Sequence, residues 1–269
     1  MSAHGPPPAT WVLLRGLTRE AAHWGDFPAA LQARWPTARV LTLDLPGCGT
    51  EHRQRSPDRI EGMVDALRAQ LKTRQVATPV HLLALSLGGM VAVDWARRYP
   101  GELAGVVLVN TSLARFSRVD QRLRPANLPA LLRLLLAARR PAAREAIVLR
   151  LTSNRADEWP AVVSAWADVR RARPVSTMNA LRQLLAAARY RAPRDAPAVP
   201  ALVLTSAGDR LVDPACSRRL AAAWSWPLAE HPGAGHDLPL DDGAWVIDQV
   251  VDQVAAQAAA QAARWRMPG

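Results

Sequence analysis

Ser86 is the residue whose surroundings point most directly to chemistry. The run 80–85 (Val-His-Leu-Leu-Ala-Leu) has the pattern of a buried strand, glycines follow at 88 and 89, and residues 90–99 have the apolar period of a helix. A serine at a sharp turn from strand to helix holds its hydroxyl clear of the sheet edge. The next backbone N–H, that of Leu87, then faces the carbonyl under attack. Ser86 is therefore a candidate nucleophile.

Two residues further along the chain could activate this serine. Asp209 follows the apolar run 200–206 on a loop that contains glycine, and His236 lies in a Gly-rich loop before the last predicted helix. A serine hydroxyl is a weak nucleophile until an imidazole takes its proton, and the imidazole needs a carboxylate to fix its tautomer. Taken alone, Asp209 could equally cap a helix, and His236 could be an ordinary loop histidine. Together, in this order, they predict a Ser-His-Asp triad.

These residues resemble those of the α/β-hydrolase superfamily, in particular its serine esterase branch. The run 84–88 (Ala-Leu-Ser-Leu-Gly) resembles the G-x-S-x-G nucleophile elbow, with alanine in place of the first glycine. The run 44–49 (Asp-Leu-Pro-Gly-Cys-Gly) resembles the family's D-x-P-G-x-G loop. Small esterases such as the pimeloyl-carrier-protein methyl ester esterases are similar in spacing and loops, as are cofactor-free haloperoxidases, aryl esterases and certain small lyases.

The resemblance also implies an oxyanion hole near the N-terminus. The residues Arg15, Gly16 and Leu17 stand where the family usually has a His-Gly pair, so the backbone N–H groups of Leu17 and Leu87 are the implied donors. Arginine at position 15 departs from the usual histidine. Gly16 and Trp24 are the implied substrate-binding residues, although packing in the core would explain Trp24 equally well.

The implied activity is hydrolysis of a carboxylic ester. Ser86 would attack the carbonyl, His236 would move the proton, Asp209 would hold His236, and water would release the acyl group. The alternative is a thioesterase or small lyase that uses the same triad on an anionic substrate. No cofactor is expected, and the histidine spacing supports no metal site.

The coarse pattern alternates strands with helices. Strands are predicted near 11–15, 39–43, 79–85, 104–110, 200–206 and 226–231, and helices near 25–35, 57–74, 88–99, 214–224 and 243–265. This predicts an α/β fold, with a mostly parallel sheet that carries helices on both faces. Residues 1–112 and 196–269 would form this core. Residues 113–195 would form an inserted helical, Arg-rich cap with helices near 128–138, 142–151, 159–171 and 177–189.

Several individual residues carry weaker expectations. Leu181, Leu184 and Leu185 are expected to pack against other cap residues or the core, as are the cap leucines 131, 134 and 135. His23 is expected on the surface or in a loop. Asp241 and Asp242 are expected to start the last helix, where negative charge suits the positive N-terminal end.

Composition agrees with a single α/β domain that carries an insertion. The chain has 269 residues, enough for a sizeable core, and only two cysteines, far apart at Cys48 and Cys216, so no disulfide is expected. The N-terminal residues lack a signal-peptide core, and no apolar run is long enough to span a membrane. These features predict a cytoplasmic protein.

The positive charge is concentrated in one segment. The formal net charge is +11, and the 34 basic residues are all arginine except Lys72. Residues 113–195 contain 17 arginines and six acidic residues, so the whole excess lies in the predicted cap. Two interpretations stay open: a solvated Arg-rich helix face, or a surface that attracts an acidic substrate or an acidic acyl carrier protein. The neutral remainder of the chain speaks against a nucleic-acid or membrane binder.

Overall fold

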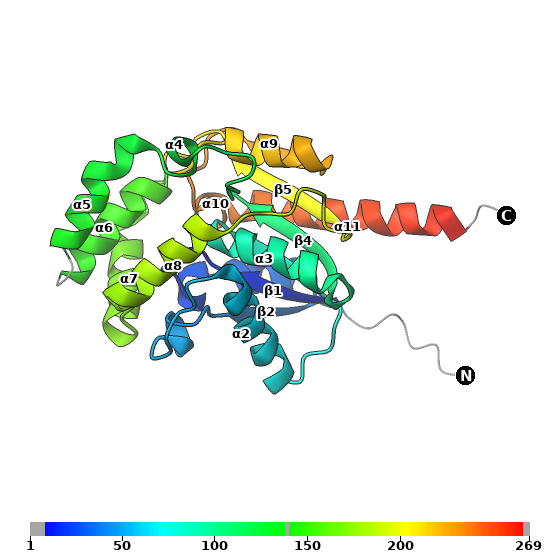
Figure 1. Ribbon diagram of the computed structural model, residues 1–269, viewed down its shortest axis with the longest axis horizontal. Coiled ribbons are helices and arrows are strands. Elements are labelled where there is room, and N and C mark those ends of the chain that lie inside the picture. Colours follow the sequence, from blue (N-terminus) through cyan, green and yellow to red (C-terminus); the bar gives the residue numbers. More distant parts are fainter. Residues whose placement is uncertain (1–8, 138–139, 266–269) are drawn as a thin grey trace.

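A computed structural model of the chain describes residues 9–137 and 140–265. Over this part of the chain, parallel strands form one six-stranded sheet in the order β2-β1-β3-β4-β5-β6 (Figure 1). The strands are β1 Thr10–Leu14, β2 Arg39–Leu43, β3 Val80–Leu85, β4 Leu103–Val109, β5 Ala201–Ser206 and β6 Leu228–His231. Each lies within two residues of its predicted position. The predicted α/β fold is therefore confirmed.

The sheet is covered on both faces because successive residues of its strands point to opposite sides. In β1, Val12 and Leu14 belong to one buried apolar cluster, whereas Trp11 and Leu13 belong to the other. The first cluster includes residues of α2 (Ile60–Thr73), α3 (Leu87–Arg98) and α9 (Ala215–Trp224). The second includes residues of α1 (Phe27–Arg34) and α11 (Gly243–Trp265). Burial on both faces explains why these strands are almost uninterrupted apolar runs.

The alternation of strands and helices stops between β4 and β5. Residues 113–195, called the insertion from here on, carry α4 (Val119–Arg122), α5 (Leu128–Leu136), α6 (Pro141–Thr152), α7 (Trp159–Ala172) and α8 (Thr177–Arg189). In Figure 1 the green α5 and α6 and the yellow-green α7 gather beyond one end of the sheet. The helices α5 to α8 match the predicted ones, apart from the predicted end of the first at Ala138, which lies outside the described residues.

The prediction for the α8 leucines was wrong. Leu181, Leu184 and Leu185 are 53%, 47% and 39% exposed, whereas Asn179 and Gln183 on the opposite side of the helix are buried. The side of α8 that carries these leucines therefore faces solvent, although the apolar pattern predicts that it faces the core. The polar side chains of the helix point inward because they hydrogen-bond to loops of the core, described below. Leu131 and Leu134 are half-buried, and the side chain of Leu135 lies outside the described part.

All the strands point the same way, so the loops after them meet at one edge of the sheet. Ser86 follows β3, Asn110 follows β4 and Asp209 follows β5. The residues Arg15–Arg19, called the oxyanion loop, follow β1. Residues 232–237, called the histidine loop, follow β6. In the described residues, no helix is both long and apolar enough to cross a bilayer. Both cysteines are buried free thiols.

Candidate active site

Ser86 occupies a strained turn between β3 and α3. Its backbone has φ +56° and ψ −113°, a region that residues with a side chain rarely adopt and that costs on the order of 1–3 kcal/mol. Three hydrogen bonds hold it there: its N–H donates to the Val109 carbonyl (2.9 Å), and its carbonyl accepts from the Thr111 hydroxyl (2.8 Å) and the Gly89 N–H (2.9 Å). The surrounding structure therefore fixes an exceptional backbone at the candidate nucleophile.

The two glycines after Ser86 are required by close contact. A Cβ on Gly88 would lie 2.8 Å from the Leu14 carbonyl oxygen, and a Cβ on Gly89 would lie 2.6 Å from the Thr111 hydroxyl. The turn into α3 can therefore pack against the end of β1 at Gly88, and against Thr111 after β4 at Gly89, only when these positions carry no side chain. This agrees with the elbow predicted from the sequence.

Asp209 and His236 meet in a buried pair. His236 Nδ1 lies 2.7 Å from Asp209 Oδ2, and the two residues are 5% and 2% exposed. The other carboxylate oxygen, Oδ1, accepts the N–H groups of Leu211 (2.8 Å) and Val212 (2.9 Å). Because a carboxylate only accepts hydrogen bonds, Nδ1 carries the proton and Nε2 carries the lone pair. This is the tautomer that a general base next to a serine needs.

The surroundings of His236 favour its protonated form. Burial has the largest effect and lowers the pKa of His236, but the charge and hydrogen bond of Asp209, helped by Asp237, outweigh it. The resulting pKa lies above the ordinary value of 6.5, although the charge of Arg15 opposes the rise. The imidazolium that forms when His236 takes a proton is therefore stabilised in place.

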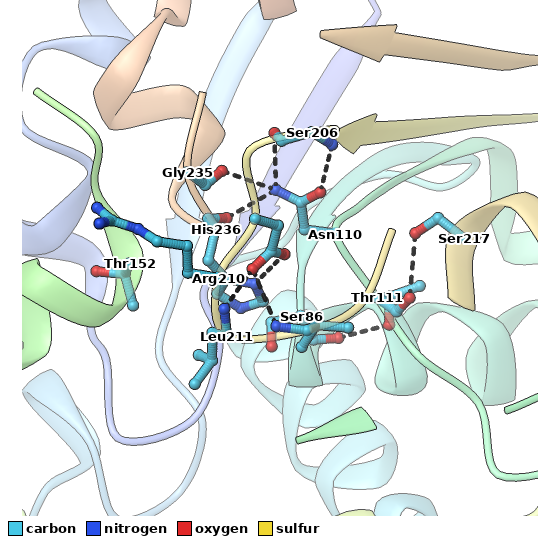
Figure 2. A network of polar contacts seen from close by, with 12 residues as sticks. Ser86, Asn110, Thr111, Thr152, Ser206, Arg210, Leu211, Ser217, Gly235 and His236 are labelled. Atoms are coloured by element: carbon cyan, nitrogen blue, oxygen red, sulfur yellow. Dashed lines mark hydrogen bonds and ion pairs between the residues drawn. The ribbon is translucent and has the colours of Figure 1, made fainter. Parts of the chain in front are cut away.

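Asn110 connects the loops that carry these residues. Its Nδ2 donates to the Ser206 hydroxyl (3.2 Å) and to the carbonyls of Gly235 (3.3 Å) and His236 (2.9 Å), and its Oδ1 accepts the Ser206 N–H (2.9 Å). Figure 2 shows this fan of contacts above Ser86 and Thr111. Asn110 thus ties the end of β4 to the end of β5 and to the histidine loop. Its signal in the sequence is weak, namely a polar residue directly after the apolar run of β4.

The oxyanion loop lies against Ser86. A Cβ on Gly16 would be 3.1 Å from the Ser86 Cβ and 3.6 Å from its Oγ, so the backbone of Gly16 lies directly beside the serine. Thr18 has φ +57°, and its N–H donates to Gln183 Oε1 of α8 (2.8 Å). The insertion therefore holds the loop that contains one predicted oxyanion donor. The donor roles of Leu17 and Leu87 and the substrate contact of Gly16 stay predictions.

Arg15 has a partner that the sequence pattern did not show. Its guanidinium donates to both carboxylate oxygens of Asp237, at 2.9 and 2.5 Å, and both side chains are almost fully buried. The guanidinium also lies over the ring of Trp24, 4.8 Å from its centroid. Trp24 is 4% exposed and stacks on Phe27 at 5.4 Å, so it belongs to the core beside this loop. Its contact with substrate stays a prediction.

The expectation that His23 lies on the surface or in a loop was wrong, because the residue is buried in the short 3-10 helix Ala21–Trp24. The residue is 5% exposed and its ring meets the Trp166 ring of α7 edge-on at 5.1 Å. Burial, together with the charges of Arg19 and Arg15, lowers the pKa of His23 well below its ordinary value, so it is neutral. The residue is drawn inside because the insertion covers this part of the core, which local sequence does not indicate.

Buried charges join the same region to the insertion. Glu145 of α6 is fully buried and accepts hydrogen bonds from Arg19 of the oxyanion loop (2.7 Å) and from Arg170 of α7. Burial, the largest effect, raises the pKa of Glu145, but the two arginines outweigh it and the pKa is lowered. The carboxylate therefore stays ionised and links the insertion to the core.

Asp241 does not start the last helix, which corrects the prediction for this residue. It ends the short helix α10 (Leu238–Asp241) and is buried. Its carboxylate accepts the Ser153 hydroxyl (2.6 Å), the Asn154 N–H (2.8 Å) and the Gly235 N–H (2.6 Å). Asp242 does cap α11, because its Oδ1 accepts the Trp245 N–H at 3.0 Å.

The turn between α6 and α7 contacts the loops of both Asp209 and His236. Asn154 Nδ2 donates to the carbonyls of Gly208 (3.1 Å) and Gly233 (2.9 Å), and the Thr152 carbonyl accepts the Asp237 N–H (2.7 Å). Sequence reasoning missed these residues, since nothing in their local pattern distinguishes them from other helix-end residues.

Comparisons with known proteins show which family the chain belongs to. The model of the alpha/beta hydrolase family matches residues 4–249. A pimeloyl-[acyl-carrier protein] methyl ester esterase of Neisseria meningitidis is 33% identical over 108 residues, which are 40% of this chain and 38% of that protein. One of Aromatoleum aromaticum is 36% identical over 118 residues, 42% of each chain. The matches thus span about two fifths of these curated relatives.

Solved structures share the fold over nearly the whole chain. The enol-lactonase of Burkholderia xenovorans superposes with a TM-score of 0.72 at 22% identity and covers 94% of both chains. A thermophilic esterase of Thermogutta terrifontis superposes with a TM-score of 0.72 at 21% identity, over 92% of this chain and 90% of that one. Because the family model matches residues 4–249, which are most of this chain, the chain belongs to the α/β-hydrolase family.

Proposed function

We propose that the protein is a serine esterase that cleaves a carboxylic ester through an acyl-enzyme. The observation that carries this proposal is the buried Asp209–His236 pair, whose geometry leaves Nε2 unprotonated at the edge of the sheet where Ser86 stands. The strained backbone of Ser86 and the close approach of Gly16 to its side chain support it. The named activities of the curated relatives, which include ester hydrolysis, point the same way.

The proposed reaction has two halves. The Ser86 oxygen attacks the ester carbonyl carbon while His236 takes its proton, and the carbonyl oxygen becomes an oxyanion that accepts the Leu17 and Leu87 N–H groups. The C–O bond to the alcohol breaks as His236 returns the proton to the leaving alkoxide. Water then attacks the acyl-enzyme with the same proton transfers, which releases the acid and restores Ser86.

A test needs a substrate whose first product is coloured. With a p-nitrophenyl ester, we expect a burst of nitrophenolate equal to the enzyme concentration, and we expect the burst and the steady rate to be lost in Ser86→Ala. A fluorophosphonate probe should label the wild type but not this variant. An Arg68→Met variant, which loses a pair with Glu102 away from Ser86, should still be labelled. Turnover that survives in Ser86→Ala would show that another group is the nucleophile.

The finer part of the proposal is that the substrate is acidic or linked to an acyl carrier protein. Two observations support it: the curated relatives named for carrier-linked esters and the arginine excess of the insertion. Several of these arginines already pair with carboxylates, among them Arg170 with Glu145 and Arg173 with Glu20. The exposed remainder, such as Arg133 and Arg150, would face the partner.

This finer part has its own test. The rate on a carrier-linked methyl ester should fall as salt is raised, because salt screens charges between separate molecules. The rate on the matching free methyl ester should change little. A carrier-linked rate that salt leaves unchanged would eliminate electrostatic docking without affecting the proposed chemistry.

A further inference from the structure

The ion pair between Arg15 and Asp237 stands between two parts of the proposed machinery. Arg15 begins the oxyanion loop two residues before Leu17, and Asp237 directly follows His236. The guanidinium donates to both oxygens of the carboxylate, and the side chains are 3% and 4% exposed. Such a fork-to-fork contact fixes direction as well as distance. The two residues are 222 positions apart, so this contact exists only because the fold brings the loops together.

We infer that Arg15 and Asp237 are positioning residues that lock the oxyanion loop to the histidine loop. Through this lock the Leu17 N–H and the His236 imidazole keep fixed positions relative to a substrate carbonyl on Ser86. The inference rests on the proposed function of these residues. It also accounts for arginine at a position where the resemblance implies histidine, because a guanidinium can donate to both oxygens of Asp237 and an imidazole cannot.

Each partner is itself held in place. The Asp237 N–H donates to the Thr152 carbonyl at 2.7 Å, and its own carbonyl accepts the N–H groups of Leu240 and Asp241. The Arg15 guanidinium lies over the Trp24 ring. A small shift of either loop would therefore be resisted from several sides. Because a buried ion pair usually contributes little more stability than a well-packed apolar pair, the main contribution of this one is geometric.

The pair also presents balanced charges to His236. Besides Asp209 from the β5 loop, the charged groups that act on the imidazole are Asp237, which raises its pKa, and Arg15, which lowers it. Removal of Asp237 alone would leave the positive charge unbalanced, and removal of Arg15 alone would leave the negative one. The two single changes should therefore move the pKa of His236 in opposite directions.

The experiment compares Arg15→Met, Asp237→Asn, the double variant and Arg15→Lys with the wild type. The readouts are kcat and KM for a neutral p-nitrophenyl ester over a range of pH, with thermal unfolding to verify the fold. Arg15→Lys keeps the charge but loses the fork, so kcat should fall by about tenfold with KM and pH profile unchanged. In Asp237→Asn the acid limb of the profile should move to lower pH, and in Arg15→Met to higher pH.

The double variant should return the acid limb to its wild-type position while kcat stays reduced. Arg68→Met is the matched control, because Arg68 forms a similar forked pair with Glu102 away from the site. If a single variant fails to fold, Arg15→Lys and the double variant still carry the test, since neither leaves a charge unpaired.

The inference is overturned if Arg15→Lys and the folded single variants keep kcat within about twofold of the wild type. It is also overturned if the acid limb moves in the same direction in Asp237→Asn and in Arg15→Met. This outcome is separate from failure of the proposed function. If only the inference fails, Ser86 still reacts with the fluorophosphonate probe and Ser86→Ala is inactive. If the proposed function fails, Ser86→Ala keeps its activity whatever the Arg15 variants do.

Discussion

Replacing Asp209 by asparagine would test how His236 is held, because the structure dictates the direction of the new amide. The Oδ1 position accepts the N–H groups of Leu211 and Val212, so the amide oxygen of the Asp209→Asn variant must take this place. The opposite orientation would lose both hydrogen bonds and set NH₂ against two donors, at a cost of about 1–3 kcal/mol for each. The amide nitrogen therefore faces His236.

This orientation forces the wrong tautomer on the imidazole. An amide N–H must donate to Nδ1, so the ring proton moves to Nε2, which then cannot accept the proton of Ser86. A change of this kind in a Ser-His-Asp site lowers kcat by about 10⁴, which corresponds to about 5.5 kcal/mol. Because the two backbone contacts are kept, the midpoint of thermal unfolding should change little.

The assay measures the rate of nitrophenolate release with enzyme in excess over the ester, so that each substrate molecule reacts once. It compares the wild type, Asp209→Asn and Asp209→Ala. Alanine removes the carboxylate without imposing a tautomer, so Asp209→Asn should be no more active than Asp209→Ala. Nitrogen-15 chemical shifts of His236 would show directly where the ring proton lies. If Asp209→Asn kept its rate within tenfold of the wild type, the role assigned to the carboxylate would be refuted.

Three further predictions concern the surroundings of the site. Gln183→Leu removes the acceptor of the Thr18 N–H, so urea unfolding should show a loss of about 1–3 kcal/mol and turnover should fall, whereas unchanged values would disprove the contact. Glu145→Gln leaves Arg19 without its carboxylate and should lower the free energy of unfolding at neutral pH by about 3–5 kcal/mol. Because the pKa of Glu145 is lowered in the folded state, its stabilisation is present above its ordinary pKa of 4.5 and is lost as the pH falls through the folded value, so acid should destabilise the wild type more than the variant. Finally, kcat/KM of the wild type should fall as the pH decreases through a pKa above 6.5, since His236 must be neutral to act as a base; an acid limb below that value would contradict the assigned surroundings.

Much of the fold could be predicted because the relevant signals are local. A strand buried on both faces must be an apolar run of about its own length, and β3 to β5 are such runs. The turn at Ser86 needs small residues within a few positions of the serine, so its pattern is visible in one short stretch. The parallel order of the strands then places Asp209 and His236 at the same edge of the sheet.

The inward and outward faces of the insertion were less predictable. The apolar pattern of α8 predicts a buried stripe, yet its buried side carries Asn179 and Gln183. Gln183 donates to Cys48 and accepts from Thr18, whereas Asn179 accepts from the Ser56 N–H. The sequence pattern of a helix indicates which of its sides is apolar. It does not indicate whether neighbouring loops offer polar groups that would draw the polar side inward.

The sequence by itself therefore determined the order of strands and helices, the turn at Ser86 and the candidates Asp209 and His236. Only the tertiary structure decided what holds the loops around these residues in place. Asp237 pairs with Arg15, Gln183 accepts from Thr18, and the turn before α7 contacts the loops that carry Asp209 and His236. The reason is physical. Strand and turn patterns involve neighbours in the chain, whereas these contacts join residues 165 and 222 positions apart, whose partners depend on how the insertion and the core pack together.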